Sequence, residues 1–221
     1  MGFKDRFSGI INNMDQYTYH MLGCGAIGSS TAIQLARMGA EKFYLYDYDK
    51  VEEPNIGVSQ YTYRDIGKPK VEALKEIIKD INKFADVTAL NSKFEGYDEN
   101  DNDIVILGFD SMSSRWEAVD IIIKIMKTKP FLLIDGRMGA EHYQQYSFNN
   151  LTLANYKKHW YSDDQGDPEP CSMKATSYCS NMAGSFVANA IRKVVKKQPY
   201  EEFVSFHFPT MSIEKTTCLF K

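Results

Sequence analysis

The stretch Tyr17-Thr-Tyr-His-Met-Leu22 runs directly into Gly23-Cys-Gly-Ala-Ile-Gly28, and this stretch decides the fold. Its first six residues predict a short β-strand. The next six have the spacing GxGxxG, in which glycines let the backbone turn tightly and approach a phosphate group. Apolar residues then recur at helical spacing as far as Gly39, where the helix should end. The order strand, glycine loop and helix predicts a nucleotide site. The structural alternative is a turn that only lets the helix pack on the strand.

An acidic residue closes the next predicted strand. Phe43–Tyr46 is β-prone, and Asp47 follows it. Asp47 lies about 20 residues beyond the glycine loop, the spacing at which a carboxylate reaches the ribose hydroxyls of a bound nucleotide. These features alone do not distinguish NAD from ATP.

Strands and helices alternate along the rest of the chain. This alternation predicts an α/β, Rossmann-like fold with a mostly parallel sheet, helices on both faces and right-handed connections, with a few antiparallel strands at the C-terminal side. The expected helices are 69–82, 113–127 and about 174–197, the expected strands are 87–90, 104–107, 131–134, 143–148, 203–208 and 216–220, and 158–172 is a polar loop.

Composition and charge limit the class of protein. The chain has 221 residues, of which 43% are hydrophobic and 25% are charged. We therefore expect a single domain over residues 1–221, with a nucleotide-binding core at about 17–135. The net charge of −3 gives no general attraction to nucleic acid or to anionic membranes. Because no apolar run approaches the roughly 20 residues of a membrane span and the N-terminus resembles no secretion signal, we expect a cytoplasmic location.

The residues after the second predicted strand help to decide which nucleotide the site binds. Residues 47–55 read DYDKVEEPN, Gln60 follows, and residues 67–70 read GKPK before a predicted helix. Asp110 ends a later strand. The combination resembles the ThiF-like family, the adenylating domain shared by ubiquitin-activating enzymes and activators of bacterial sulfur carriers. The family pattern is a glycine loop, D-x-D-x-V-x-x-x-N, R-Q and G-x-x-K, and the resemblance extends over about residues 17–197.

This resemblance implies a role for each matching residue. It also implies ATP and Mg²⁺ as cofactors, and a homodimer. The implied nucleotide-binding residues are Gly23, Gly25, Gly28, Asp47, Asp49, Asn55, Gln60 and Lys70, with Asp47 on the ribose, Asn55 and Lys70 on the phosphates, Lys70 and Asp110 catalytic, and Asp110 on the metal.

The implied reaction activates the C-terminal carboxylate of a small ubiquitin-like or sulfur-carrier protein, or of a peptide. A carboxylate is a poor electrophile, and attack by its oxygen on the α-phosphate of ATP gives an acyl-adenylate with a good leaving group. Because two anions must meet, the protein has to supply cations and N–H donors in place.

One charge of the family pattern is missing. The sequence has Val58-Ser-Gln60 where the family has Arg-Gln, so a phosphate-neutralising charge is lost or supplied elsewhere. Arg137 follows a predicted buried strand and is our candidate catalytic residue, its alternative being a surface loop arginine. The other candidates are Arg64, Lys68, Lys70, Arg115 and, from a partner subunit's N-terminal segment, Arg6.

The four cysteines form no CxxC pair, which argues against a structural zinc site. Cys24 lies inside the glycine loop, and Cys179 and Cys218, in apolar or strand-like surroundings, are expected to be buried. Cys171, in Glu169-Pro-Cys-Ser172, resembles the thioester cysteine segment of eukaryotic relatives and is a candidate nucleophile, its alternative being a cysteine that packs the loop. The absence of a large cysteine-bearing insert argues against a full thioester cascade.

Three other functions remain open. A catalytically silent binding module or partner subunit is favoured by the missing arginine. The chain could also adenylate a non-protein carboxylate, such as a modified tRNA base, although its net charge disfavours a large nucleic-acid surface. The third function is an NAD-dependent oxidoreductase, against which Asn55, Lys70 and Asp110 argue, because hydride transfer needs no metal-binding carboxylate.

Overall fold

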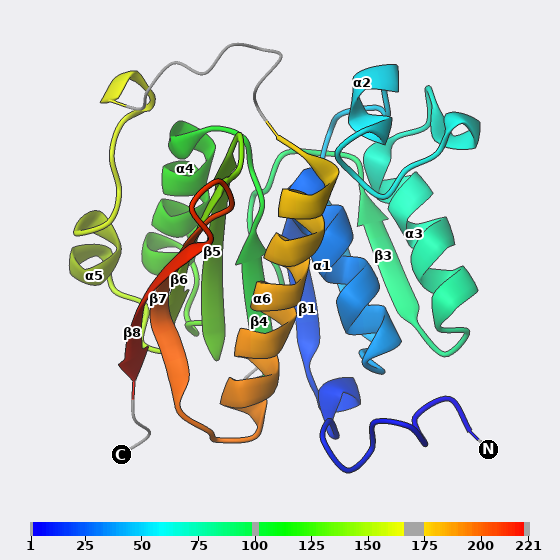
Figure 1. Ribbon diagram of the computed structural model, residues 1–221, viewed down its shortest axis with the longest axis horizontal. Helices are drawn as coiled ribbons and strands as arrows, with labels where there is room; N and C mark the ends of the chain where they lie inside the picture. Colours follow the sequence, from blue (N-terminus) through cyan, green and yellow to red (C-terminus); the bar gives the residue numbers. More distant parts are fainter. Residues whose placement is uncertain (1, 99–101, 166–174, 219–221) are drawn as a thin grey trace.

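The computed structural model describes residues 2–98, 102–165 and 175–218. One eight-stranded sheet runs through them in the order β3-β2-β1-β4-β5-β6-β7-β8, with β1 to β5 parallel and β6 to β8 antiparallel (Figure 1). This confirms the predicted Rossmann-like α/β fold. The strands are β1 (Thr18–Leu22), β2 (Lys42–Tyr46), β3 (Asp86–Leu90), β4 (Asp103–Leu107), β5 (Leu132–Gly139), β6 (His142–Phe148), β7 (Tyr200–His207) and β8 (Ser212–Cys218). The helices are α1 (Ala26–Arg37), α2 (Glu53–Ile56), α3 (Lys70–Ile81), α4 (Met112–Lys124), α5 (Leu153–Lys157) and α6 (Ser177–Val195), with short 3₁₀ helices η1 (Met14–Gln16), η2 (Tyr63–Asp65) and η3 (Asp163–Gln165).

Helices cover both faces of the sheet. Helices α1, α3 and α6 pack on one face and α4 and α5 on the other, so that the core has two hydrophobic clusters (Figure 1). Every residue of β1 and of β4 is buried, as expected for parallel strands covered on both faces.

Close helix packing depends on small residues. A Cβ added at Gly184 of α6 would lie 2.3 Å from the Ser30 Oγ atom of α1. The small residues in the N-terminal half of α6 therefore let this helix pack closely against α1. Within the described residues, no helix combines the length and apolar character needed to cross a membrane.

The register of the sheet brings three strand ends together. Leu22 at the end of β1 pairs with Tyr46 of β2 on one side and with Leu107 of β4 on the other. The segments that begin at Gly23, Asp47 and Gly108 therefore leave the sheet side by side, where open α/β sheets bind their ligands.

Several predicted elements differ from the structure. β5 continues to Gly139, so Asp135 and Arg137 are strand residues that pair with β6, not residues of a following loop. Helices α2 and α5 were not predicted, because four or five residues are too few to show helical periodicity. β7 and β8 begin earlier than predicted; β8 is largely exposed, so its sequence carries little burial signal.

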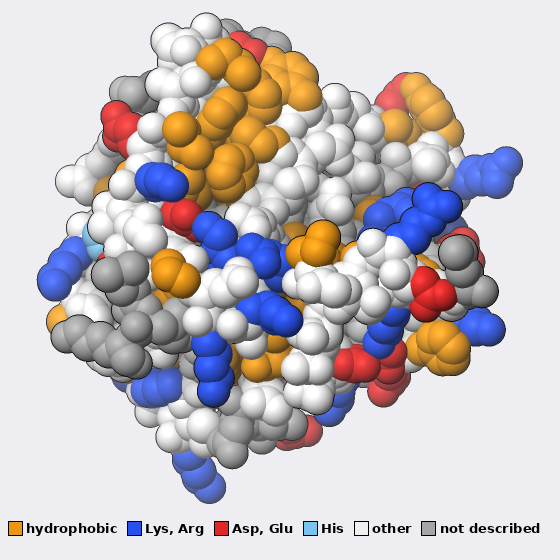
Figure 2. Space-filling view, turned by 60° about the horizontal axis from the view of Figure 1, so that its bottom comes forward, with side chains coloured by type: hydrophobic (Ala, Val, Ile, Leu, Met, Phe, Trp, Pro, Cys, Tyr) orange, Lys and Arg blue, Asp and Glu red, His pale blue; other side chains and the backbone are white. Residues whose placement is uncertain are grey.

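The surface charge is uneven. Figure 2 turns the lower end of the molecule toward the viewer, and Lys and Arg side chains are spread over much of it beside a gathered hydrophobic area. The net charge of −3 therefore does not describe each face of this molecule.

Candidate nucleotide-binding site

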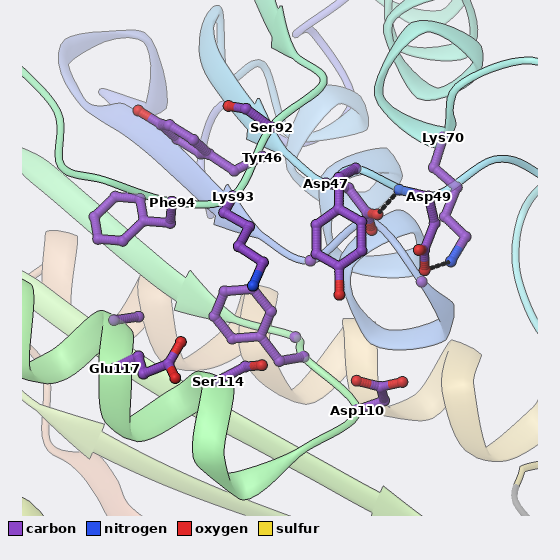
Figure 3. Close-up of a pocket in the computed structure, with 16 residues that line it drawn as sticks. Tyr46, Asp47, Asp49, Lys70, Ser92, Lys93, Phe94, Asp110, Ser114 and Glu117 are labelled. Carbon is purple, nitrogen blue, oxygen red and sulfur yellow. Dashed lines mark hydrogen bonds and ion pairs between the residues drawn. The ribbon is translucent and has the colours of Figure 1, made fainter.

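A pocket lies at the carboxyl ends of β1, β2 and β4 (Figure 3). It combines residues that the sequence analysis selected from four separate segments. These residues are Gly23, Gly25, Asp47, Asp49, Lys70 and Asp110.

The three glycines of the loop have different roles. Gly23 has φ +94°, and a Cβ there would lie 2.7 Å from the Gly108 carbonyl carbon; a Cβ on Gly28 would lie 1.9 Å from the Gly23 oxygen. These two glycines are required by the fold itself. Gly25 is the N-cap of α1 without a side-chain cap, and a Cβ there would meet nothing within 4 Å. The open space at Gly25 therefore lies at the uncapped N-terminus of α1, where free N–H groups and the helix dipole favour an anion.

Asp47 links β2 to the glycine loop. Its carboxylate accepts hydrogen bonds from the backbone N–H of Cys24 at 2.8 Å and from that of Asp49 at 2.9 Å. Burial raises the pKa of Asp47 in spite of these two donors. The remaining lone pairs of the carboxylate are available for hydroxyl donors in the pocket.

Lys70 supplies a cation opposite Asp110. Its Nζ atom lies 2.7 Å from the Asp49 carboxylate, and Figure 3 shows Asp110 facing this pair across the pocket. Burial alone would lower the pKa of Lys70, but the hydrogen bond with Asp49 and the charges of Asp47, Asp49 and Asp110 raise it. Lys70 is therefore protonated throughout the physiological pH range.

The other end of the pocket carries apolar and aromatic side chains, and sequence reasoning missed it. Tyr46, Phe94 and Ala118 are buried there, and the exposed Lys93 and Glu117 lie near the rim (Figure 3). Such surfaces accept an aromatic ring. The segment after β3 carries no motif; its only signal is a cation and an aromatic residue directly after a strand.

Two predicted nucleotide-binding side chains, Asn55 and Gln60, bond to other residues of the chain and do not line the pocket. Asn55 Oδ1 accepts from the Glu52 N–H at 2.9 Å in a capping box of α2. The Gln60 side chain donates to Asn181 Oδ1 at 2.8 Å. Their roles toward a nucleotide remain predictions.

The candidate replacement cations occupy different environments. Lys70 lines the pocket, whereas Lys68 pairs with Glu76 at 2.6 Å. Arg115 and Arg137 are buried, are not among the pocket-lining residues, and both form ion pairs with Asp135. Arg137 is therefore a buried strand residue and not a surface loop arginine, and its guanidinium forms an ion pair with Asp135.

The cysteines in the described part of the chain are structural thiols. Cys24, Cys179 and Cys218 form no disulfide among the described residues; the first two are buried, and Cys218 is partly buried. Burial raises the pKa of Cys24 well above its usual value and that of Cys179 to about 11, so neither is an activated nucleophile. Cys171 lies outside the described residues.

The carboxylates of the pocket fit a Mg²⁺ site in which the substrate phosphates supply some of the ligands. No group of three or more His, Cys, Asp or Glu side chains among the described residues could hold a metal ion. Mg²⁺, however, is commonly held by one or two carboxylates together with water and substrate phosphates. Asp110 lines the same pocket as Gly25, which fits that pattern, with the phosphates as the other ligands.

The comparison with protein families gives the class. The ThiF family model matches residues 8–220, and the chain belongs to this family.

Among individual sequences, the chain is similar to ubiquitin-like modifier-activating enzyme 5. It is 37% identical to the Bombyx mori protein over 86 residues, which cover 38% of this chain and 22% of that protein. It is 33% identical to the Drosophila pseudoobscura pseudoobscura protein over 106 residues, 48% of this chain and 26% of that protein. The matched regions thus span about a quarter of these relatives.

Solved structures share the fold. A crystal structure of PaaA superposes with a TM-score of 0.71 at 21% identity, covering 94% of this chain and 65% of that chain. E. coli MccB superposes with a TM-score of 0.72 at 18% identity, covering 92% and 62%. MccB in a structure with ATP gives a TM-score of 0.69 at 15% identity, covering 92% of this chain and 64% of that chain.

Proposed function

We propose that this protein is an ATP-dependent adenylyltransferase that activates a C-terminal carboxylate as an acyl-adenylate. The observation that carries the proposal is one pocket lined by Gly25, at the uncapped N-terminus of α1, together with Lys70 and Asp110. Membership of the ThiF family and the fold shared with ATP-bound MccB support ATP as the nucleotide.

The residues divide the work along the pocket. The aromatic end around Tyr46 and Phe94 would take the base, Asp47 the ribose hydroxyls, and the loop N–H groups with Lys70 the phosphates. Mg²⁺ held by Asp110 would supply further positive charge when bound.

The reaction needs positioning and charge neutralisation from the chain. An oxygen of the acceptor carboxylate forms a bond to the α-phosphorus of ATP, and the bond from that phosphorus to the bridging oxygen of pyrophosphate breaks. The acceptor is already ionised at pH 7, so no general base is required. Lys70 and the N–H donors of the loop reduce the repulsion between the two anions.

We propose a ubiquitin-like or sulfur-carrier protein, or a peptide, as the acceptor. The similarity to ubiquitin-like modifier-activating enzyme 5 supports a ubiquitin-like acceptor, and the fold is shared with MccB in a structure that also contains MccA. We further propose a homodimer, which the resemblance to the ThiF-like family implies, and a cytoplasmic location, which three cysteines without a disulfide support.

The rival functions have less support. A silent module would need no cation in the pocket, whereas Lys70 and Lys93 both line it. An NAD-dependent oxidoreductase gives no role to Asp110 opposite Lys70.

Calorimetry with ATP and NAD, each with MgCl₂, tests the nucleotide. We expect ATP to bind and NAD to show no appreciable binding; tight NAD binding without ATP binding would refute the proposal. ATP–pyrophosphate exchange with candidate acceptors then tests the acceptor class. Exchange should need the acceptor's free C-terminal carboxylate, and an acceptor with an amidated C-terminus is the matched control.

A further inference from the structure

The segment 159–163 is fastened to the N-terminus of α4, beside the pocket. The two carboxylate oxygens of Asp163 accept hydrogen bonds from the N–H groups of Met112 at 2.5 Å and of Ser113 at 3.1 Å. Trp160 donates from Nε1 to the Met112 carbonyl at 2.9 Å. The carboxylate of Asp163, which is distant in the sequence, therefore lies at the positive N-terminal end of α4. This helix begins two residues after Asp110.

A buried charge network completes the connection from the other side. Arg115 donates to the carbonyl of Phe109, the residue before Asp110, and pairs with Asp135. Arg137 pairs with the same carboxylate at 2.7 Å and donates to the His159 carbonyl at 2.7 Å. These contacts form a closed ring that includes the turn with Asp110. From the end of β4 the ring passes through Arg115, Asp135 and Arg137 to segment 159–163, and from there through the N-terminus of α4 back to the turn.

Asp163 adds a second carboxylate close to this ring. Two buried guanidinium groups share the single buried carboxylate of Asp135. The hydrogen bond from the Ser113 side chain, the two α4 N–H groups and the charge of Arg115 lower the pKa of Asp163. The negative charge of Asp163 therefore lies near Arg115 as well as at the N-terminus of α4.

We propose that Asp163, together with Arg137, is a positioning residue for Asp110. By capping α4 and closing the ring, it holds the turn after β4 in the geometry in which Asp110 faces Lys70 and the phosphate end of the pocket. This inference rests on the proposed function, because it assumes that Asp110 binds the metal of Mg–ATP. A cap that only stabilised α4 would alter unfolding but not the response of the pocket to MgCl₂.

Asp163→Asn separates these two roles, and Asp164→Asn is its matched control. An asparagine side chain has one acceptor oxygen where the aspartate uses two, and it carries no charge. Asp164 lies next to it in η3 and is also exposed. Because both sites are exposed, both variants should fold.

The functional readout is ATP affinity, measured by calorimetry in EDTA and again with MgCl₂. Asp163→Asn should match the wild type within about twofold in EDTA. The gain in affinity produced by MgCl₂ should fall several-fold, up to about tenfold, the range expected for a lost helix cap. Asp164→Asn should behave like the wild type in both conditions.

The chain provides its own spectroscopic reporter. Its two tryptophans, Trp116 and Trp160, lie in this contact, with ring centroids 4.9 Å apart. Asp163→Asn should increase acrylamide quenching and weaken the near-UV circular dichroism of the pair. Mg–ATP should change this signal in the wild type and in Asp164→Asn, but less in Asp163→Asn.

The failures are distinguishable. A wild type that binds no ATP in either condition refutes the proposed function. A wild type that binds ATP, with an Asp163→Asn variant whose MgCl₂ response equals that of Asp164→Asn, overturns the inference alone.

Discussion

Replacing Gly25 by alanine should separate binding from folding. The added methyl group meets nothing within 4 Å, so it creates no steric clash. Alanine is a poorer N-cap than glycine but loses less entropy on folding, so the free energy of unfolding should change by less than about 1 kcal/mol. The methyl group does, however, enter the space where a phosphate would approach the α1 N–H groups. Losing one charge-assisted hydrogen bond costs about 1.5–3 kcal/mol, or roughly tenfold to 150-fold in ATP affinity.

Gly28→Ala is the contrasting variant. Its Cβ would lie 1.9 Å from the Gly23 carbonyl oxygen, so the backbone must move, at a cost of about 3 kcal/mol or more in stability. Urea unfolding and calorimetry with ATP measure both effects for both variants. If Gly25→Ala folds normally and binds ATP as tightly as the wild type, the loop is a packing turn and our interpretation of Gly25 fails.

Four further predictions concern single side chains. Asp47→Asn should weaken ATP binding at least tenfold in calorimetry, because a charged acceptor for the ribose is lost; unchanged affinity would remove Asp47 from the site. Asp110→Ala should keep ATP affinity in EDTA within about twofold and reduce pyrophosphate exchange by about 10²–10³; full exchange would contradict its role. Burial opposes ionisation of Asp135, but the two arginines lower its pKa below 3.8, so its pairs stabilise the fold above that pH and this stability is lost as pH falls through the lowered pKa. Urea unfolding between pH 2 and 6 should show a larger loss of stability in the wild type than in Asp135→Asn. Cys171→Ala should leave exchange nearly intact; if a thioester forms, only the reducible band on non-reducing gels should disappear.

The local features that identify the fold could be predicted from the sequence. The glycine loop, Asp47 and Lys70 are each read within one segment, and the rule that parallel strands end at one edge brings those segments together. That is why residues as distant in the chain as Gly25, Lys70 and Asp110 were expected in one pocket, and they line it.

Contacts that depend on non-local packing could not be predicted. Asp135 and Arg137 are two residues apart on β5 and so share a face, but the sequence could not show that Arg115 approaches the same carboxylate from α4. Asp163 caps a helix that begins 51 residues earlier in the chain. Near the start of that helix the sequence shows only the local N-cap residue Ser111 and gives no sign of Asp163. The aromatic end of the pocket was missed for the same reason.

The most direct test of the proposed activity is the identity of its products. Wild-type protein is incubated with ATP, MgCl₂ and an acceptor that supports exchange, and nucleotides and acceptor are analysed by mass spectrometry. We expect AMP and pyrophosphate as the nucleotide products, and an acceptor that gains one adenylyl group at its C-terminal carboxylate. ADP and inorganic phosphate, with an unmodified acceptor, would contradict the assignment of this pocket to carboxylate adenylation.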